Sequence, residues 1–321
     1  MKKALVIFIL ALFVATGAFA QLSVAGQIRT DFGWNLALED FEMDATEWQF
    51  VNFAGTGTWA QVAAGGDVAN GWVRVRANNS WVGLANVNLG NVTLRMGQGE
   101  PVARWSNLAI WGDSNWGIGA SSFNTQPYVE FRTMGFYAGL AQAGVHNVTF
   151  ENNPLPGFYA GYDMSIPGIG LNFAFAARPL SVGDDSYFPF MINARGQFLN
   201  IGPATITVNA AIYSNPEFGF WAITAGQAAG LTSRSGDDNL LVLEALLDAA
   251  FGLGIGTFVI TAGCVTNFDS DQDGIALQVG ASLNSPLGGG FSIRPGFRYR
   301  TIIDQDVSDV LGIGLSLQYN F

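Results

Sequence analysis

The last eleven residues of the chain alternate strictly between two kinds of side chain, and this pattern limits the fold more than any other feature. One parity carries Leu311, Ile313, Leu315, Leu317, Tyr319 and Phe321, and the other carries Gly312, Gly314, Ser316, Gln318 and Asn320. A period of two predicts a β-strand with one apolar face and one small or polar face. An aromatic residue at the end of such an apolar face is typical of strands that meet lipid.

The composition supports a fold whose outer surface is not covered by water. The chain is 49% hydrophobic and only 12% charged, whereas about 25% charged residues is usual for a soluble protein. After the N-terminal segment no run of 18 uninterrupted apolar residues occurs, which argues against membrane-spanning helices. A closed antiparallel barrel accounts for both facts, because only every second residue meets lipid and all backbone groups pair between strands.

Polar residues share one parity in other segments as well. Near the C-terminus, Phe291, Ile293, Phe297, Tyr299 and Ile303 alternate with Ser292, Arg294, Arg298 and Arg300. An arginine that faces lipid at the bilayer midplane costs about 2–4 kcal/mol, so these arginines are expected to line a wet lumen. Similar alternation marks residues 22–34, 171–178, 188–199, 204–213 and 275–284.

The connections predict the number of strands. Short turns at 166–170, 199–203 and 284–290 alternate with longer polar segments, as in outer-membrane barrels with short inner turns and long outer loops. Counting from the C-terminus gives about sixteen strands, with both chain ends on one side of the membrane. Residues 240–250 fit either a strand or a helix, so fourteen strands is an alternative. The predicted fold class is all-β, a transmembrane antiparallel β-barrel, and residues 21–321 form its single domain.

The first twenty residues predict a signal peptide for export. Lys2 and Lys3 precede an apolar run, and Ala18 and Ala20 occupy the −3 and −1 positions before Gln21, a pattern that predicts cleavage there. The apolar run is too short for a membrane helix. The only cysteine, Cys264, lies far from the cleavage site, so no lipid anchor is expected there, and we interpret it as a small wall residue.

Charge and residue content exclude several functions. Cleavage removes both lysines and leaves twelve Arg against twenty-five Asp and Glu, so a nucleic-acid partner is not expected. The chain has one histidine, His146, no zinc motif and no phosphate-binding glycine loop. A nucleophile and base cannot be assigned, so we expect no enzymatic activity and no cofactor.

Three consecutive segments resemble the general trimeric porins of Gram-negative bacteria. They are the turn and strand at 68–73, the strand that begins Trp81-Val82-Gly83-Leu84, and the glycine-containing strand at 89–98. The resemblance implies an outer-membrane channel for passive diffusion of ions and small polar solutes, in contact with lipid and assembled as a homotrimer. It also implies that the long segment 99–126 folds into the barrel and constricts the pore.

This long segment departs from the family pattern. It carries only Glu100 and Asp113 in place of an acidic tip, and it is rich in tryptophan, with Trp105, Trp111 and Trp116. These tryptophans either pack the loop against the wall or stack sugars. A substrate-selective channel for sugars or other nutrients is therefore an alternative, and a plugged structural or adhesive surface barrel is another.

The predicted parity identifies candidate pore residues. The arginines placed toward the lumen are Arg29, Arg74, Arg76, Arg95, Arg132, Arg294, Arg298 and Arg300. The first five face a loop with Glu100 and Asp113, and opposed charges across a narrow pore create a transverse field that sets ion preference. The alternative is that the arginines only solvate the lumen and pair locally with Asp31, Asp163 or Glu130.

Two acidic outer segments suggest a divalent-cation site. They contain Asp269, Asp271, Asp273, Asp304, Asp306 and Asp309. Alternating carboxylates followed by Gly274 resemble the first half of a calcium loop, although Gly280 stands where the bidentate Glu would be needed. We interpret these carboxylates as either a Ca²⁺ or Mg²⁺ site at the outer loops or a pair of solvated turns.

The signal-peptide interpretation predicts the N-terminus of the mature protein. N-terminal sequencing of protein purified from membranes of an expressing bacterium should begin at Gln21, because small residues at −3 and −1 direct cleavage after Ala20. A mature chain that still begins at Met1 would contradict this interpretation.

Overall fold

The computed structural model describes the chain from residue 21 onward, with gaps. The described residues are 21–39, 42–43, 49–52, 58–76, 81–98, 122–123, 127–141, 157–177, 179–182, 185–214, 221–222, 241–267, 275–303 and 309–321. The predicted signal peptide lies outside them. Within them every regular element is a strand, and none is a helix of the length and hydropathy that a membrane crossing requires.

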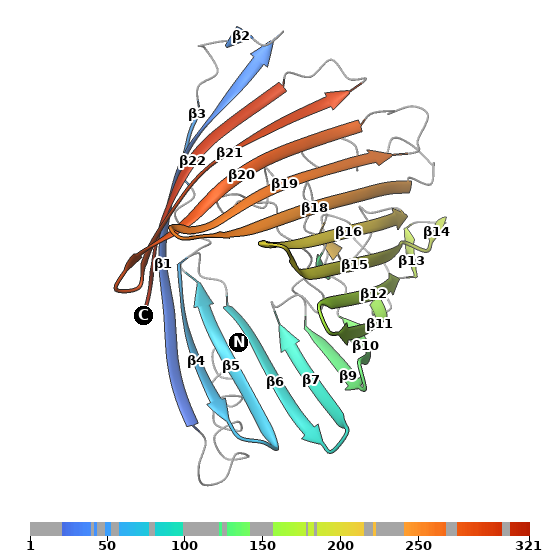
Figure 1. Cartoon of the computed structure of the whole chain (residues 1–321). Helices are drawn as coiled ribbons and strands as arrows, with labels where there is room; N and C mark the ends of the chain where they lie inside the picture. Colours follow the sequence, from blue (N-terminus) through green and yellow to red (C-terminus); the bar gives the residue numbers. More distant parts are fainter. Residues whose placement is uncertain are drawn as a thin grey trace.

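Sixteen strands form the wall of a barrel (Figure 1). They are β1 (Gln21–Glu39), β4 (Trp59–Gly65), β5 (Ala69–Arg76), β6 (Trp81–Leu89), β7 (Val92–Gln98), β9 (Tyr128–Thr133), β10 (Phe136–Ala141), β11 (Gly157–Ile166), β12 (Ile169–Ala177), β15 (Phe190–Ile201), β16 (Ala204–Ser214), β18 (Leu241–Leu253), β19 (Gly256–Asn267), β20 (Ile275–Gly288), β21 (Phe291–Ile303) and β22 (Asp309–Asn320).

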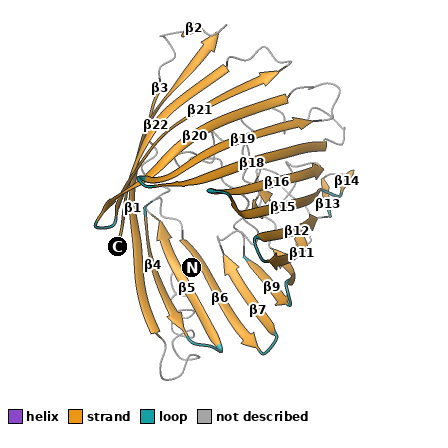
Figure 2. Cartoon of the chain, viewed as in Figure 1, coloured by secondary structure: helices purple, strands orange, loops and turns teal. Residues whose placement is uncertain are grey.

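Each wall strand pairs antiparallel with its neighbour, and the last strand returns to the first. β22 pairs with β1 from Gln27 to Leu38. On its other side, β1 pairs with β4 over Gln21–Gln27 and with β3 (Gln49–Asn52) over Phe32–Asn35. The ring has no free edge, because each of the sixteen strands pairs with a neighbour on both sides. Figure 2 shows these strands in orange. The predicted all-β barrel of about sixteen strands is confirmed.

The remaining short strands lie in the connections. β2 (Glu42–Met43) pairs with the end of β1, and β13 (Leu180–Val182) pairs with β14 (Asp185–Tyr187). β8 (Ser122–Phe123) pairs with β17 (Trp221–Ala222). The last pair joins two connections that are far apart in the sequence.

Tight turns gather at the end of the barrel that carries the first and last residues of the wall. At this end β9 and β10 are joined by Met134 and Gly135 alone, both with positive φ, as a two-residue type I′ hairpin turn requires. Phe321 exchanges two backbone hydrogen bonds with Gly26, which places the start of β1 beside the C-terminus. The alternation of short turns and long connections follows the predicted pattern.

Two local expectations are corrected. Residues 241–253 form a strand, β18, so the helix and the fourteen-strand barrel are wrong. These residues form a strand despite their helical propensity, because β18 pairs along its whole length with β16 and β19. The turn expected at 284–290 is shorter, because β20 continues to Gly288 across a register shift and only Gly289 and Gly290 separate it from β21.

Side chains alternate between an apolar outer face and a polar inner face. In β9, Val129 is 49% exposed and the next residue, Glu130, is 1% exposed. Phe131, Phe173, Ile192, Val208, Leu247, Ile260, Val279, Phe297, Ile313 and Leu317 are further exposed apolar residues of the outer parity. At the short-turn end, Tyr319 packs between Phe291 and Phe321, with ring centroids 4.5 and 6.1 Å away. A band of this kind matches a lipid environment.

The two faces of β16 predict different responses to arginine. Val208→Arg places a charge on the outer face and should destabilise the barrel by about 2–4 kcal/mol in phospholipid bilayers, whereas Thr205→Arg places it on the inner parity and should change stability little. Urea unfolding in vesicles measures both variants. Equal destabilisation by the two variants would contradict the assigned faces.

Candidate pore site on the inner wall

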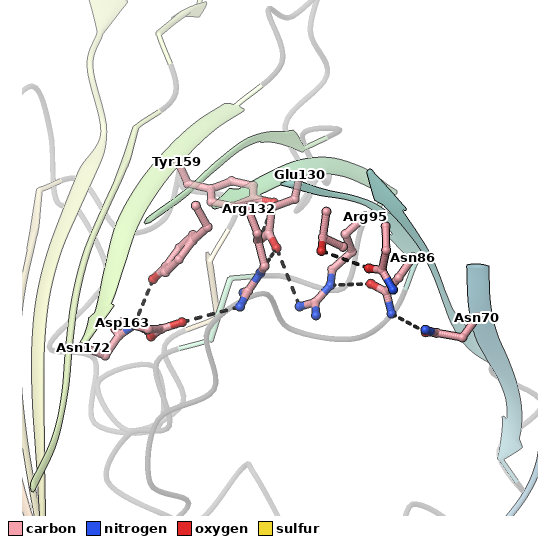
Figure 3. Close-up of polar contacts among 11 residues, drawn as sticks. Asn70, Asn86, Arg95, Glu130, Arg132, Tyr159, Asp163 and Asn172 are labelled. Carbon is pink, nitrogen blue, oxygen red and sulfur yellow. Dashed lines mark hydrogen bonds and ion pairs between the residues drawn. The ribbon is translucent and has the colours of Figure 1, made fainter. Parts of the chain in front are cut away.

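A ladder of polar side chains crosses the inner face of β5, β6 and β7 (Figure 3). Asn86 Nδ2 donates to Asn70 Oδ1 at 2.8 Å, and Arg95 Nε donates to Asn86 Oδ1 at 2.9 Å. These residues meet because they are register partners on adjacent strands. The ladder therefore follows from strand register and parity.

Glu130 on β9 is the centre of this network. Its Oε1 lies 3.6 Å from Arg95 Nη1 and also accepts from Arg132 Nε. Its Oε2 accepts a hydrogen bond from Tyr159 Oη at 3.1 Å. A buried carboxylate costs desolvation energy unless cations and donors surround it. Here two arginines and a tyrosine supply both, so Glu130 fixes the positions of two cations on the wall.

The network continues from Arg132 to β11 and β12. Arg132 Nη1 lies 3.5 Å from Asp163 Oδ2, and Asn172 Nδ2 donates to Asp163 Oδ1 and, at 3.2 Å, to Tyr137 Oη. The Arg132 guanidinium also lies 4.9 Å from the centre of the Tyr137 ring. Cations and anions thus alternate on the inner wall from Arg95 on β7 to Asp163 on β11, and Asn172 extends the network to β12, as Figure 3 shows.

Inward tyrosines lie over glycines on the neighbouring strand. Tyr128 faces Gly97, Tyr159 faces Gly139 and Tyr137 faces Gly161 in direct register. A Cβ added to these glycines would lie 2.5, 2.3 and 2.3 Å from the tyrosine atoms. The rings therefore lie flat against the wall, which leaves lumen space and directs the Tyr159 hydroxyl to Glu130.

The inner wall has two halves with different exposure. Inward residues toward the long connections are buried all along β9–β21, and these include Tyr128, Tyr159, Ala176, Met191, Val242, Glu244, Val265, Ala276, Gln278 and Ile302. Toward the short turns the charged groups reach solvent, and the Arg132 and Asp163 side chains are 27% and 48% exposed. Among the described residues, water therefore contacts mainly the half of the wall near the short turns.

Strand pair β8 and β17 links two distant connections. β8 lies between β7 and β9, and β17 lies between β16 and β18, so six wall strands separate the two points of insertion. Strands so far apart lie on different sides of a sixteen-stranded ring. The predicted constricting segment 99–126 is described only at Ser122 and Phe123. These two residues pair with β17, which belongs to the connection between β16 and β18 on another side of the ring.

The register places all eight candidate arginines on the inner parity. Arg29 Nε donates to Ser316 Oγ at 3.0 Å, Arg74 donates to Gln61, and Arg298 is buried. Arg76, Arg294 and Arg300 share the parity of these residues on their strands. Glu100 and Asp113 lie outside the described residues, so the opposed-charge constriction stays a prediction.

The acidic outer segments are described only at Asp309, whose carboxylate accepts a hydrogen bond from Tyr299 Oη. Asp269, Asp271, Asp273, Asp304 and Asp306 lie outside the described residues, as does His146. In the part of the chain that the structure places, no group of three or more His, Cys, Asp or Glu is arranged to hold a metal ion. The divalent-cation site therefore stays a prediction.

Sequence reasoning missed the tyrosines and asparagines of the network. Asn70, Asn86 and Asn172 share the parity of nearby arginines or acids, so parity alone could have identified them. The tyrosine–glycine pairs had no such signal, because which glycine faces which tyrosine depends on the register between strands.

The fold is similar to those of known outer-membrane channels, although no family model and no curated protein matches the sequence. The outer membrane channel DcaP of Acinetobacter baumannii has a TM-score of 0.70 at 13% identity, covering 95% of this chain and 98% of that one. An anion-selective porin from Comamonas acidovorans has a TM-score of 0.65 at 12% identity, covering 94% and 100%. OmpT of Vibrio cholerae, in a trimer form, has a TM-score of 0.56 at 11% identity, covering 95% and 100%. The expected porin-like fold is confirmed.

The tyrosine–glycine packing predicts a stability difference between two alanine variants. Gly139→Ala should destabilise the barrel by about 1–3 kcal/mol, because its Cβ would lie 2.3 Å from Tyr159 Oη and 2.6 Å from a backbone oxygen. Gly252→Ala is the control, since nothing lies within 4 Å of its Cβ. Unfolding in urea measures both, and equal stability would refute the packing role of Gly139.

Proposed function

We propose that this protein is a porin of a bacterial outer membrane, a water-filled channel through which ions and small polar solutes diffuse passively. The observation that carries the proposal is a charged inner wall, with partly exposed Arg95, Arg132 and Asp163, inside a closed barrel with an apolar exterior. A lumen lined with fixed charges holds water and lowers the cost of moving hydrophilic solutes across a bilayer.

The described inner wall carries more cations than anions. Among the residues whose side chains the structure describes, the inward cations are Arg29, Arg74, Arg76, Arg95, Arg132, Arg195, Arg294, Arg298 and Arg300, and the inward acids are Glu130, Asp163, Glu244 and Asp248. Fixed positive charge concentrates anions in a narrow pore. We therefore propose a preference for anions, with Glu100 and Asp113 as opposing charges on the loop.

A plugged structural or adhesive barrel is the second candidate. The observation in its favour is the buried inner face toward the long connections, where Tyr159, Met191 and Val242 are removed from solvent. We favour the channel because Arg132 and Asp163, toward the short turns, remain partly exposed.

The proposal includes lipid and protein partners. The apolar outer face fits outer-membrane lipid, and export would follow cleavage of the signal peptide before Gln21. We propose a homotrimer, with support from the trimer form of the similar OmpT barrel. Divalent cations at the outer aspartates are a further proposal. The proposal includes no catalytic activity, no nucleic-acid partner and no other cofactor.

Single-channel recording tests the proposed function. Purified protein, refolded in detergent and inserted into a planar bilayer, should give stable conductance steps, and the reversal potential in a KCl gradient should have the sign of an anion preference. Demonstrably folded barrels that give no steps would overturn the channel and favour the plugged barrel.

Opposite substitutions in the network should shift ion selectivity in opposite directions. Glu130→Gln should raise the anion-to-cation permeability ratio and Arg95→Gln should lower it, each by roughly two- to sixfold, since a unit charge about 4–8 Å from an ion in water contributes about 0.5–1 kcal/mol. Reversal potentials at low ionic strength measure both ratios, because salt screens the effect. A shift of the same sign in both variants would contradict the pore-lining role.

A further inference from the structure

A cation and an anion lie on opposite sides of β16 on the inner wall, away from the Glu130 network. Arg195 lies on β15 and Asp248 on β18, and both strands pair with β16 (Figure 1). Arg195 is opposite Asn209 and Asp248 is opposite Thr207, so the two charged residues are offset by one inward position. Two strand spacings and this offset separate their backbones by about 12 Å. Both side chains are half-buried, so part of each reaches solvent on the lumen side.

The protein satisfies neither charged group completely. Asp248 lies within electrostatic range of Arg195, yet Arg195 Nε and Asp248 Oδ1 are buried and have no hydrogen-bond partner among the residues that the structure describes. Glu130 and Arg132, by contrast, are joined directly. A buried polar atom without a partner costs free energy that an added partner would recover.

A buried amide adds to the cationic end of this pair. Asn209 is fully buried, and Asn193 Nδ2 donates to its Oδ1 at 3.0 Å. Asn209 Nδ2 has no hydrogen-bond partner within the described part of the chain. Arg195 and Asn209 are in direct register and both carry a donor that lacks an acceptor, whereas Asp248 carries an acceptor that lacks a donor. The cluster therefore favours a negative group at one end and a positive group at the other.

These two ends select a class of solute. An anion would supply acceptors to Arg195 but would be repelled by Asp248, and a cation would be attracted by Asp248 but repelled by Arg195. An uncharged polar solute would offer hydrogen bonds without charge, which are weaker. A small zwitterion carries a carboxylate and an ammonium on one short body, so it suits both ends.

We propose that Arg195, Asn209 and Asp248 form a site in the lumen for small zwitterions such as α-amino acids. The solute carboxylate lies at Arg195 and Asn209, and its ammonium lies at Asp248. This inference rests on the proposed channel, which would bring solutes to the inner wall. Because the two wall charges nearly cancel at a distance, the site acts on solutes in contact with it and adds little to the proposed anion preference.

Alanine and lactamide test the site, because they are similar in size and have no net charge, and only alanine is a zwitterion. Proteoliposomes swell as either solute enters, and the alanine-to-lactamide ratio of swelling rates, after subtraction of protein-free vesicles, reports the preference. Arg195→Gln and Asp248→Asn should each lower this ratio by roughly two- to fivefold, as expected for the loss of one partly hydrated charge contact. Lactamide entry in the same vesicles corrects for the number of open barrels.

Arg300→Gln is the matched control. It also removes one inward arginine charge, but from β21, which is separated from β18 by β19 and β20. This variant should keep the ratio of the unmodified channel. If Arg300→Gln lowers the ratio as much as Arg195→Gln does, or if Arg195→Gln and Asp248→Asn leave it unchanged, the site is overturned while the porin stands.

Equilibrium binding separates this inference from the proposed function. Saturation-transfer NMR of the refolded protein in detergent detects weakly bound alanine without any flux. Transfer to alanine that both Arg195→Gln and Asp248→Asn reduce, in barrels that do not conduct, would support the site and overturn the channel. Conducting barrels that transfer no more saturation to alanine than to lactamide would overturn the site and leave the channel.

Discussion

The pairing of β22 with β1 is the constraint on which the rest of the structure depends. A strand edge exposed to hydrocarbon leaves backbone N–H and C=O groups without partners, and each costs several kcal/mol. The twelve register pairs from Gln27 to Leu38 remove that edge. Once the ring is closed, every side chain of the wall points either outward or inward. The strict alternation at the C-terminus and the polar ladder inside are two consequences of one closure.

Closure also explains why so many charged residues fit inside an apolar protein. Inward arginines on adjacent strands would repel one another unless acids stand between them, and Glu130 and Asp163 alternate with Arg95 and Arg132. The lumen also needs space, because large side chains on every inward position would fill it. The glycines opposite the tyrosines provide this space, since each ring lies along the wall where a Cβ would otherwise stand.

A structural feature could be predicted from the sequence where it depends on residues close together in the chain. The period-two pattern predicted which face of a strand is apolar, and parity placed all eight candidate arginines on the inner face, because both depend on neighbours two residues apart. Residues 241–253 have no such unambiguous signal, and pairing with β16 and β19 makes them a strand. The Glu130 network required the register between β7, β9 and β11, which single-sequence reasoning does not supply. Likewise, nothing in the sequence indicated that the Arg74 guanidinium lies over the rings of Trp59 and Trp72.

The inner wall is divided along the barrel axis, and this division connects the structure to the proposed channel. Inward residues toward the long connections are buried on both sides of the ring, from Tyr128 and Tyr159 to Val242 and Ile302. Toward the short turns, Arg132 and Asp163 remain partly exposed. Glu130 and Arg95 lie at the boundary between the two halves, where the Glu130 side chain is fully buried and the Arg95 side chain is 24% exposed. A charge beside buried, low-dielectric material is screened less than a charge surrounded by water, so the buried half contributes to the proposed selectivity without touching the solute.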